Sequence, residues 1–363
     1  MACNISIKLV CDYFRPLTIE NEETIISINF WLNGVLGTLI VLIGLVMNTL
    51  ATVVLRTNKD MKQLAHYLLS ALFIINIVFL FTKFINILYY DFYFQSIIVL
   101  LPYFIYPMEK FSTSATVFCV VSLAHLSYAV AWDPQKYNRI SKSKTLRRKY
   151  ARFYVTCSLT LAFIINIPRW LTYKLSYNEN NYSMEKTPLK SKFEYVVFYE
   201  NFVLNIITVF TPITLLVFFN WSAHNIIHER QSELSRKLSL YKTGKLDAKP
   251  FQDESSQIKC KINASAQNRE VKHMLVVIVI IFIVCHLPRC FTKFYDGFYT
   301  PYPLKIFESV QRMLLILHAA STPIVYIRGN KIFWKHFNGI FISFNKQLKS
   351  LEIPIKHNQR HRY

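Results

Sequence analysis

The sequence predicts an all-α membrane protein, a bundle of seven transmembrane helices followed by a short amphipathic helix on the membrane surface. Its 363 residues are 53% hydrophobic and only 17% charged, with a mean hydropathy of +0.26, whereas soluble domains carry about 25% charged residues. Charge-free segments recur along the chain, and basic residues gather in every second connection between them. This composition excludes a disordered chain and a small disulfide scaffold. With only 7 glycines and no glycine-rich phosphate loop, a soluble nucleotide-binding enzyme is also not expected.

Seven apolar segments are long enough, or nearly so, to cross a membrane as helices. A crossing takes ~20 residues of low charge, because the hydrocarbon core is ~30 Å thick. We expect the spans at about residues 30–55, 62–90, 111–132, 152–169, 200–229, 272–289 and 312–328. Spans four, six and seven are free of charge for only 15 or 16 residues. Arg169, Arg289 and Arg312 at their ends are therefore expected to snorkel or to face a watery interior.

The apolar segment 92–108 raises the question of an eighth crossing. Pro102 and Pro107 interrupt it, and proline breaks a helix interior. We interpret this segment as a loop and the outer end of span three. An odd number of spans also keeps the basic C-terminal segment on the same face as the other basic connections.

The distribution of Lys and Arg predicts the orientation. Of the 42 basic residues, 29 lie in four segments at one face of the bundle. These segments are 56–62, 131–152, 224–272 and 328–363. Because basic loops stay in the cytoplasm, the N-terminus is expected outside the cell. The expected location of the protein is the plasma membrane. The chain then divides into an extracellular N-terminus (1–29), a seven-helix domain (30–340) with a long cytoplasmic loop (224–272), and a basic tail (341–363).

The net charge of +21 is explained by this topology. It is expected to meet anionic membrane lipid or an acidic partner protein, most clearly at the run 142–152, and not nucleic acid. Asn4 and Asn181 begin glycosylation sequons on the predicted outer side. His224 and His228 have a spacing that could hold a metal, but no third ligand is evident. No metal, no cofactor and no enzyme activity are predicted.

Polar residues and prolines inside the spans indicate where function resides, because each costs free energy in lipid unless the bundle satisfies it. Asn48 and Asn76 lie mid-span, and Pro212, Pro288 and Pro323 interrupt spans five, six and seven. Kinked helices around a polar centre would give a cavity with hinges. The alternative is that a membrane protein scatters a few such residues in its core without further role.

These landmarks, in this order, resemble the rhodopsin-like family of G-protein-coupled receptors. The resemblance covers about residues 30–340. The matching stretches are Asn48, residues 72–76 (LFIIN), residues 126–137 (LSYAVAWDPQKY), Phe282 with Cys285 and Pro288, residues 322–326 (TPIVY), and residues 333–337 (FWKHF) in the predicted surface helix. Residues 106–107 (YP) and 166–170 (NIPRW) are similar to invertebrate FMRFamide-type neuropeptide receptors.

Several positions depart from the pattern of this family. Ser127 stands where the family has the Arg that reaches the G protein, and a serine cannot supply the five donors of a guanidinium. Asn76 replaces the Asp that helps bind sodium, and His286 replaces a Trp of span six. The Cys that joins span three to the second outer loop would fall near Pro102, and the loop 173–194 has no Cys. Sodium control is therefore not expected, and coupling to a heterotrimeric G protein is left open.

The resemblance implies a ligand cavity between the outer ends of the spans. Glu109 is its strongest candidate, because an acid in the outer half of a span is costly unless it is paired. Three roles remain open: contact with a cationic ligand such as an Arg-Phe-amide peptide, an internal ion pair with Arg289, Arg312 or Lys110, or a pair that the ligand breaks. The candidate ligand-binding residues are Glu109, Asn86, Lys83, Asn201, Asn205, Arg289, Gln311 and Arg312. The candidate activation and coupling residues are Ser127, Tyr128, Asn76, His286, Pro288, Pro323 and Tyr326.

Together these features predict a receptor for an extracellular ligand, most simply a neuropeptide of FMRFamide type, that signals by movement of span six. One alternative is a receptor-like protein that binds a ligand or another receptor without coupling, which Ser127 favours. Another alternative is a seven-helix transporter or ligand-gated channel, which would require inverted repeats or several intramembrane acids.

Overall fold

A computed structural model describes residues 19–57, 64–178, 181–242, 276–288, 302–329 and 333–339. Within these residues, six helices are long and apolar enough to cross a membrane. They are Glu23–Thr57, Leu64–Tyr90, Leu101–Trp132, Lys144–Leu171, Tyr195–Glu233 and Ile306–Gly329. A shorter apolar helix, Val276–His286, lies where span six was predicted. The predicted all-helical bundle is confirmed.

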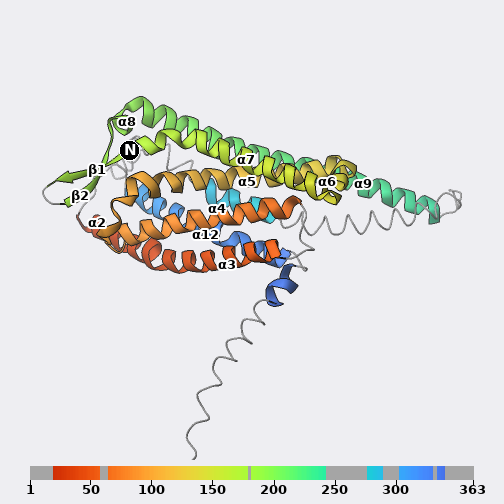
Figure 1. The fold of residues 1–363 in the computed structure, drawn as a ribbon, viewed down its shortest axis with the longest axis horizontal. Helices are drawn as coiled ribbons and strands as arrows, with labels where there is room; N and C mark the ends of the chain where they lie inside the picture. The colour runs from red at the N-terminus through yellow and green to blue at the C-terminus, as the bar shows by residue number, and fades with distance from the viewer. Residues whose placement is uncertain are drawn as a thin grey trace, which may run out of the picture.

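The long helices run side by side along one axis (Figure 1). In chain order the elements are α2 (Ile19–Asn29), η1 (Phe30–Leu36), α3 (Gly37–Thr57), α4 (Leu64–Tyr90), η3 (Gln95–Ile97), η4 (Leu101–Ile105), α5 (Tyr106–Trp132), α6 (Pro134–Lys142), α7 (Lys144–Asn166), η5 (Ile167–Leu171), β1 (Tyr173–Asn178), β2 (Asn181–Lys186), α8 (Pro188–Ser191), η6 (Tyr195–Val203), η7 (Ile206–Phe210), α9 (Thr211–Lys242) and α12 (Tyr302–Gly329). Segments η1, η4, η6 and η7 are π-helical turns within the long helices.

The core follows from α4 and α5, which lie at the centre of the bundle. α4 packs against α3, α5 and α7, while α5 also packs against α7 and α9, and α12 packs against α3. Leu72 and Phe73 on α4 and Val117 on α5 are fully buried. Many other large apolar side chains face outward, such as Phe153 and Trp221, as expected for helices whose outer faces contact lipid.

Gly44 allows the close approach of α3 to its neighbours. A Cβ atom built on Gly44 would lie 2.8 Å from Ala320 Cβ and 2.8 Å from Leu80 Cδ1. A Cβ atom built on Gly37, the first residue of the same helix, would have its nearest neighbour at 3.5 Å. Small residues at helix crossings in membranes let backbones pack closely in this way.

Gly44→Ala is therefore expected to destabilise the bundle by roughly 1–3 kcal/mol through overpacking. Gly37→Ala serves as the control and should be neutral or slightly stabilising, because alanine is the better helix former. Thermal unfolding of the detergent-solubilised protein measures both. Equal stability of the two variants would show that the crossing is not as tight as described.

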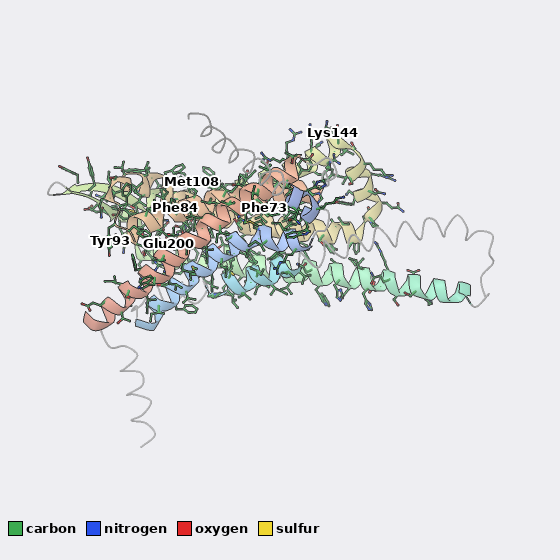
Figure 2. All side chains as sticks on the ribbon, turned by 90° about the horizontal axis from the view of Figure 1, so that it is seen from below. Phe73, Phe84, Tyr93, Met108, Lys144 and Glu200 are labelled. Atoms are coloured by element: carbon green, nitrogen blue, oxygen red, sulfur yellow. The ribbon has the colours of Figure 1, made fainter. Side chains whose placement is uncertain are left out.

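The two ends of the bundle differ in structure. The hairpin β1–β2 and α8 lie at one end, and α6 and the C-terminal part of α9 lie at the other (Figure 1). Tyr93 and Glu200 lie toward the hairpin end, and Lys144 lies toward the opposite end (Figure 2). The hairpin end is the predicted outer face, and the end near Lys144 is the predicted cytoplasmic face.

The outer hairpin was not predicted from the sequence. Its strands pair antiparallel, from Tyr173 opposite Lys186 to Asn178 opposite Asn181. The Leu175 backbone N–H donates to the Tyr103 hydroxyl at 3.4 Å, and the Tyr106 and Tyr173 rings meet edge to face at 4.7 Å. Noncovalent contacts thus hold the hairpin to the outer end of span three.

At the other end, polar caps shape the turn between α5 and α7. The Asp133 carboxylate accepts the Lys136 backbone N–H at 2.9 Å and Pro134 begins α6, while Ser143 caps α7. Asp, Ser and Pro are favoured at these positions because the first N–H groups of a helix lack intrahelical partners. These caps let the charged residues before the apolar part of span four fold as helix.

Several helices are longer than the apolar segments suggested. The first begins at Ile19, within the predicted N-terminal segment 1–29, and α9 continues to Lys242, within the predicted loop 224–272. α7 begins at Lys144, eight residues before the predicted span. The charge-free rule marks the lipid-crossing part of a helix, not the point where the helix ends. Residues 333–339 are helical, as predicted, with Phe333 buried and Trp334 exposed.

Candidate functional site

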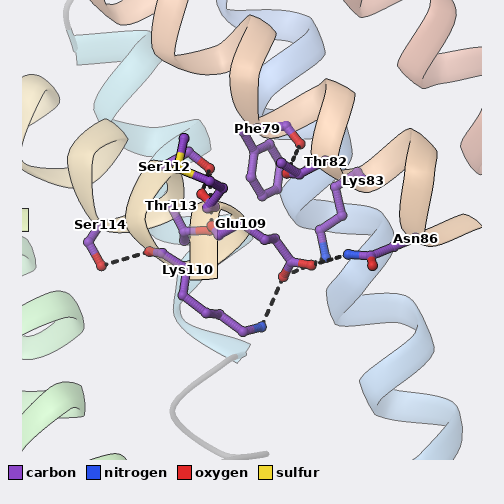
Figure 3. A network of polar contacts seen from close by, with 10 residues as sticks. Phe79, Thr82, Lys83, Asn86, Glu109, Lys110, Ser112, Thr113 and Ser114 are labelled. Carbon is purple, nitrogen blue, oxygen red and sulfur yellow. Dashed lines mark hydrogen bonds and ion pairs between the residues drawn. The ribbon is translucent and has the colours of Figure 1, made fainter. Parts of the chain in front are cut away.

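A buried cluster of charged and polar residues surrounds Glu109 on α5. Figure 3 shows Lys83 and Asn86 of α4 pointing toward its carboxylate. Lys83 Nζ lies 3.0 Å and Lys110 Nζ 2.9 Å from Glu109 Oε1, and Asn86 Nδ2 donates to Glu109 Oε2 at 2.5 Å. Lys83 and Asn86 are three residues apart, so they share one face of α4.

The ion pair between Lys83 and Glu109 is deeply buried. Their side chains are 10% and 8% exposed, whereas that of Lys110 is 27% exposed. A buried carboxylate is tolerated only when ion pairs and hydrogen bonds replace its lost hydration. The internal-pair hypothesis is confirmed for Lys110. Lys83, considered only as a cavity residue, is a second ion-pair partner.

In the first turns of α5, hydroxyl side chains that follow Glu109 in the sequence bond to the helix backbone. Ser112 Oγ donates to the Met108 carbonyl at 2.7 Å, and Thr113 Oγ1 donates to the Glu109 carbonyl at 2.7 Å. Pro107 lies at the start of α5, where proline has no donor to lose. Local backbone contacts therefore fix the helix turn that carries Glu109.

A second group of buried charges lies at the same end of the bundle. Arg169 was expected from the sequence to snorkel or to face a watery interior, whereas Glu200 was not singled out. Glu200 of η6 and Arg169 of η5 are 5% and 4% exposed. Lys190 of α8 forms an ion pair with Glu200, and the Tyr199 hydroxyl donates to the Ile165 carbonyl. Both Glu200 and Arg169 lie at the ends of charge-free segments, so they were interpreted as boundaries of membrane spans. Their burial places both charged side chains inside the outer end of the bundle.

The remaining predicted ligand residues lie at several places. Asn201 and Asn205 are buried on the span-five helix, and Asn205 Nδ2 donates to the Asn201 carbonyl at 2.7 Å. Gln311 is half-buried on α12. Arg289 lies outside the described residues. The Asn205 side chain is thus partly satisfied by the backbone of its own helix, and no hydrogen bond among the described residues joins either asparagine to Glu109.

Arg312 takes part in a network that joins the first and last helices. Its Nη2 donates to Asn29 Oδ1 at 3.1 Å and to Ser309 Oγ at 3.2 Å. Ser309 also donates to Asn29. The nearby Asp91 lies just beyond α4, and burial raises the pKa of its carboxyl to about 6 although the Arg312 charge acts to lower it. Of the three partners predicted for Glu109, Lys110 forms the pair, Arg312 bonds to Asn29 and Ser309 instead, and Arg289 lies outside the described residues.

A polar centre joins four helices in the middle of the bundle. Asn48 Nδ2 of α3 donates to the Ala319 carbonyl of α12 at 3.0 Å. Asn76 Nδ2 of α4 donates to Asn48 Oδ1 at 3.5 Å, and Thr116 Oγ1 of α5 donates to Asn76 Oδ1 at 3.2 Å. Asn48 and Asn76 are fully buried. The two mid-span asparagines thus meet through hydrogen bonds, while the predicted cavity and hinges around them stay a prediction.

Comparison with known protein families identifies the chain. Residues 47–326, more than three quarters of the sequence, match the family described as 7 transmembrane receptor (rhodopsin family). The chain belongs to this receptor family. A search of curated proteins finds no match. The receptor is thus a multi-pass membrane protein that recognises an extracellular ligand, and it is a signalling protein and not an enzyme. Membership in this family favours a receptor over a transporter or channel.

In the receptor, the predicted activation residues of spans six and seven meet in the core. The His286 ring stacks on Phe282 with ring centroids 4.2 Å apart, and it meets the His318 ring edge at 5.1 Å. His286 and His318 are buried, and Pro288 follows two residues later on the same helix. Span six and α12 therefore contact each other through imidazole rings where the family pattern has a tryptophan.

Tyr326 occupies the inner part of the receptor core. Pro323 lies within α12 one turn before it. The Tyr326 side chain is fully buried, and its ring contacts the Phe73 ring at 6.1 Å and the Phe333 ring at 4.9 Å. The contact with Phe333 joins the end of α12 to the surface helix.

The inner end of α5 carries Ser127 and Tyr128. Ser127 is half-buried. The Tyr128 ring packs near Phe219 of α9 at 5.7 Å, and Arg230 Nη2 of α9 donates to the Trp132 carbonyl at 3.1 Å. Aromatic and backbone contacts thus join α5 to α9 at this end.

Of the two predicted glycosylation residues, Asn4 lies outside the described residues, and Asn181 is the first residue of β2.

Proposed function

We propose that this receptor binds a small neuropeptide of FMRFamide type at its outer end and transmits binding to a G protein. The observation that carries this proposal is the buried cluster of Glu109, Lys83, Lys110 and Asn86. Ionisable residues within a membrane span are costly and are retained chiefly for function. The proposal places the receptor in the plasma membrane, with its N-terminus outside and glycosylated at Asn4 and Asn181.

The chemistry of the cluster suggests how a peptide would act. An Arg-Phe-amide terminus presents a guanidinium, which binds a carboxylate through two parallel hydrogen bonds. Lys110 is the more exposed of the two ammonium groups on Glu109. We infer that the peptide guanidinium displaces Lys110 and leaves the deeper pair with Lys83 in place. The ligand then favours one bundle arrangement only to the extent that it binds that arrangement more tightly.

In this proposal the bundle responds by movement of span six about Pro288. The contacts of the stacked Phe282 and His286 rings with the His318 ring edge would shift as span six pivots, and an inner cleft would open toward the G protein. A population shift from 1:99 to 99:1 requires the peptide to bind the open arrangement about 10⁴-fold more tightly. The basic loops at the inner end would meet anionic lipid and the partner protein.

The test is a G-protein recruitment screen over amidated peptides, with cells expressing the receptor, Glu109→Gln and Lys110→Gln. Glu109→Gln should lower the potency of an Arg-Phe-amide peptide roughly 10- to 100-fold, the value of one charge-assisted contact. Lys110→Gln removes the competitor and should maintain or raise potency. A purely structural pair would instead reduce surface expression in both variants.

Glu185→Gln is the matched control. Glu185 belongs to the outer hairpin and pairs with Lys174 at 3.6 Å in an exposed position, so its neutralisation should leave potency unchanged. A cationic peptide that activates the receptor and Glu109→Gln equally would refute the assignment of the site. An epitope tag at residue 1 that is detected only in permeabilised cells would refute the orientation.

A second candidate function is a receptor-like protein that binds its ligand, or another receptor, without coupling. Ser127 favours it, because the family Arg at this position is missing. Measurable peptide binding without recruitment of any G protein would support this second function over the first.

A further inference from the structure

Arg169 is a buried arginine at the outer end of the bundle. It lies in η5, the short turn that ends the span-four helix, and it is 4% exposed. Among the residues that the structure describes, no carboxylate pairs with its guanidinium, and its Nε is buried without a hydrogen-bond partner. A buried guanidinium costs free energy unless an acceptor replaces the water that it has lost. The described contacts leave this guanidinium without such an acceptor.

The Tyr195 hydroxyl is a second buried polar group of this kind. Tyr195 is 8% exposed, and its hydroxyl has no hydrogen-bond partner in the described part of the chain. The charge of Arg169 acts on this hydroxyl. Tyr195 begins η6, a π-helical segment, and such segments are frequent at functional sites.

Tyr199 joins the two helices that carry these groups. Its ring packs near the Tyr195 ring, with centroids 5.1 Å apart. Its hydroxyl donates to the Ile165 carbonyl on the span-four helix. Arg169 and Tyr195 are therefore brought to one place by a contact between spans four and five.

The acid of this region already has a partner. Glu200 lies on the same π-helical segment as Tyr195, but its carboxylate pairs with Lys190 of α8. A guanidinium has five donors and no acceptor, and a hydroxyl can donate as well. A carboxylate only accepts, and it binds a guanidinium through two parallel hydrogen bonds. The group that matches Arg169 and Tyr195 is thus a carboxylate that the described part of the chain does not supply.

Tyr106 relates these two residues to the Glu109 cluster. Lys110 Nζ lies over the Tyr106 ring, 5.2 Å from its centroid. The charges of both Arg169 and Glu109 act on the Tyr106 hydroxyl. A peptide that ends in an amide has no C-terminal carboxylate. A carboxylate that reaches Arg169 while the guanidinium of the same peptide binds Glu109 must therefore belong to an earlier residue of that peptide.

We propose that Arg169 and Tyr195 form an anion subsite, which binds the side-chain carboxylate of an Asp or Glu residue that precedes the Arg-Phe-amide terminus of the ligand. This inference rests on the proposed function, because Glu109 binds the guanidinium of the same peptide. The receptor then recognises two opposite charges in a fixed order along the peptide. The ligand supplies the acceptor for the buried guanidinium, so this contact contributes to affinity and not to the stability of the empty receptor.

The test measures peptide binding and not G-protein recruitment, so a receptor that does not couple still gives a result. Fluorescent alanine-based heptapeptides ending in Arg-Phe-amide carry one Asp or one Asn at each upstream position, and a parallel set has Gln in place of the Arg. At one position at least, the Asp peptide should bind about 10- to 100-fold more tightly than the Asn peptide, the range of a charge-assisted hydrogen bond.

Two variants remove the two parts of the subsite. Arg169→Met should abolish the preference for Asp over Asn. Tyr195→Phe keeps the ring and should reduce this preference roughly 3- to 10-fold, because it removes one hydrogen bond. Lys174→Gln is the matched control. It removes an exposed positive charge of the outer hairpin and should change the preference less than about twofold.

The two peptide sets separate this inference from the proposed function. If Asp and Asn peptides bind equally while the receptor still prefers Arg over Gln, the anion subsite is refuted and the proposed function stands. If the receptor prefers Asp but binds the Arg and Gln peptides equally, the subsite is supported and the assignment of Glu109 is refuted. Absence of binding by every peptide refutes both.

Thermal unfolding of the solubilised receptor without peptide distinguishes a ligand contact from a structural one. Arg169→Met should unfold at the same temperature as the unmodified receptor or higher, because it removes a buried charge that lacks an acceptor. A lower unfolding temperature would show that the guanidinium stabilises the fold, and it would overturn the proposal.

Discussion

Replacing Glu109 by leucine is expected to remove roughly 3–5 kcal/mol of stability from the folded receptor, because it leaves the Lys83 ammonium buried without its carboxylate. Replacing Lys83 by methionine in the same chain should restore most of this loss. An apolar pair of similar volume needs no desolvation of charge, so it is often as stable as the ion pair it replaces. Lys83→Met alone should cost less, because Lys110 and Asn86 still engage Glu109.

Lys110→Met is the matched control for this rescue. Its side chain is 27% exposed, against 10% for Lys83, so its ammonium can turn toward water once Glu109 is gone. Lys110→Met should therefore rescue Glu109→Leu far less than Lys83→Met does. The measurement is thermal unfolding of the solubilised receptor over the full double-mutant cycle. Equal rescue by the two lysine substitutions would show that burial does not set the cost.

Introducing arginine at position 127 is expected to raise G-protein recruitment by roughly 10- to 100-fold, the value of a charge-assisted hydrogen bond. Ser127 is half-buried at the inner end of α5, beside a Tyr128 ring that packs near Phe219 of α9. A guanidinium there would reach beyond the helix end with five donors. Because the adjacent residue is Leu126 and not an acid, the new charge would lack an adjacent restraint, and basal signalling should rise as well.

Ser127→Gln is the control, because glutamine adds length and polarity without charge. It should leave recruitment close to that of the unmodified receptor. Recruitment is measured with and without the activating peptide, at matched surface expression. If Ser127→Arg stays as silent as Ser127→Gln while peptide binding persists, the receptor-like function without coupling gains the stronger support.

The helical bundle could be predicted because its signal is local. Charge-free length identifies a lipid-crossing helix, and the excess of Lys and Arg in alternate connections indicates which face is cytoplasmic. The ends of helices were less predictable. α7 extends into charged sequence because the Ser143 cap, and not an apolar residue, determines where it begins. The hairpin β1–β2 depends on contacts with Tyr103 and Tyr106, which sequence distance conceals.

The candidate outer site was predictable in part for a similar reason. Glu109 stands out in the sequence as an acid inside an apolar region, and its pairing with the adjacent Lys110 was one of the interpretations considered. Its pair with Lys83 depends on how α4 and α5 are rotated against each other, which no local pattern encodes. Glu200 was missed, and the two alternatives for Arg169 stayed open, because a charge at the end of an apolar segment looks the same in the sequence whether it faces water or the bundle interior.

The hairpin β1–β2 contacts the bundle through a tyrosine hydroxyl, a ring contact and apolar packing of Leu175 and Met184. The sequence has no cysteine between Cys157 and Cys260. The hairpin therefore contains no disulfide that a thiol reductant could reduce, and its folding does not depend on an oxidising compartment. Dithiothreitol should therefore leave the position of the hairpin unchanged, and production of the receptor in a reducing host should not alter that position.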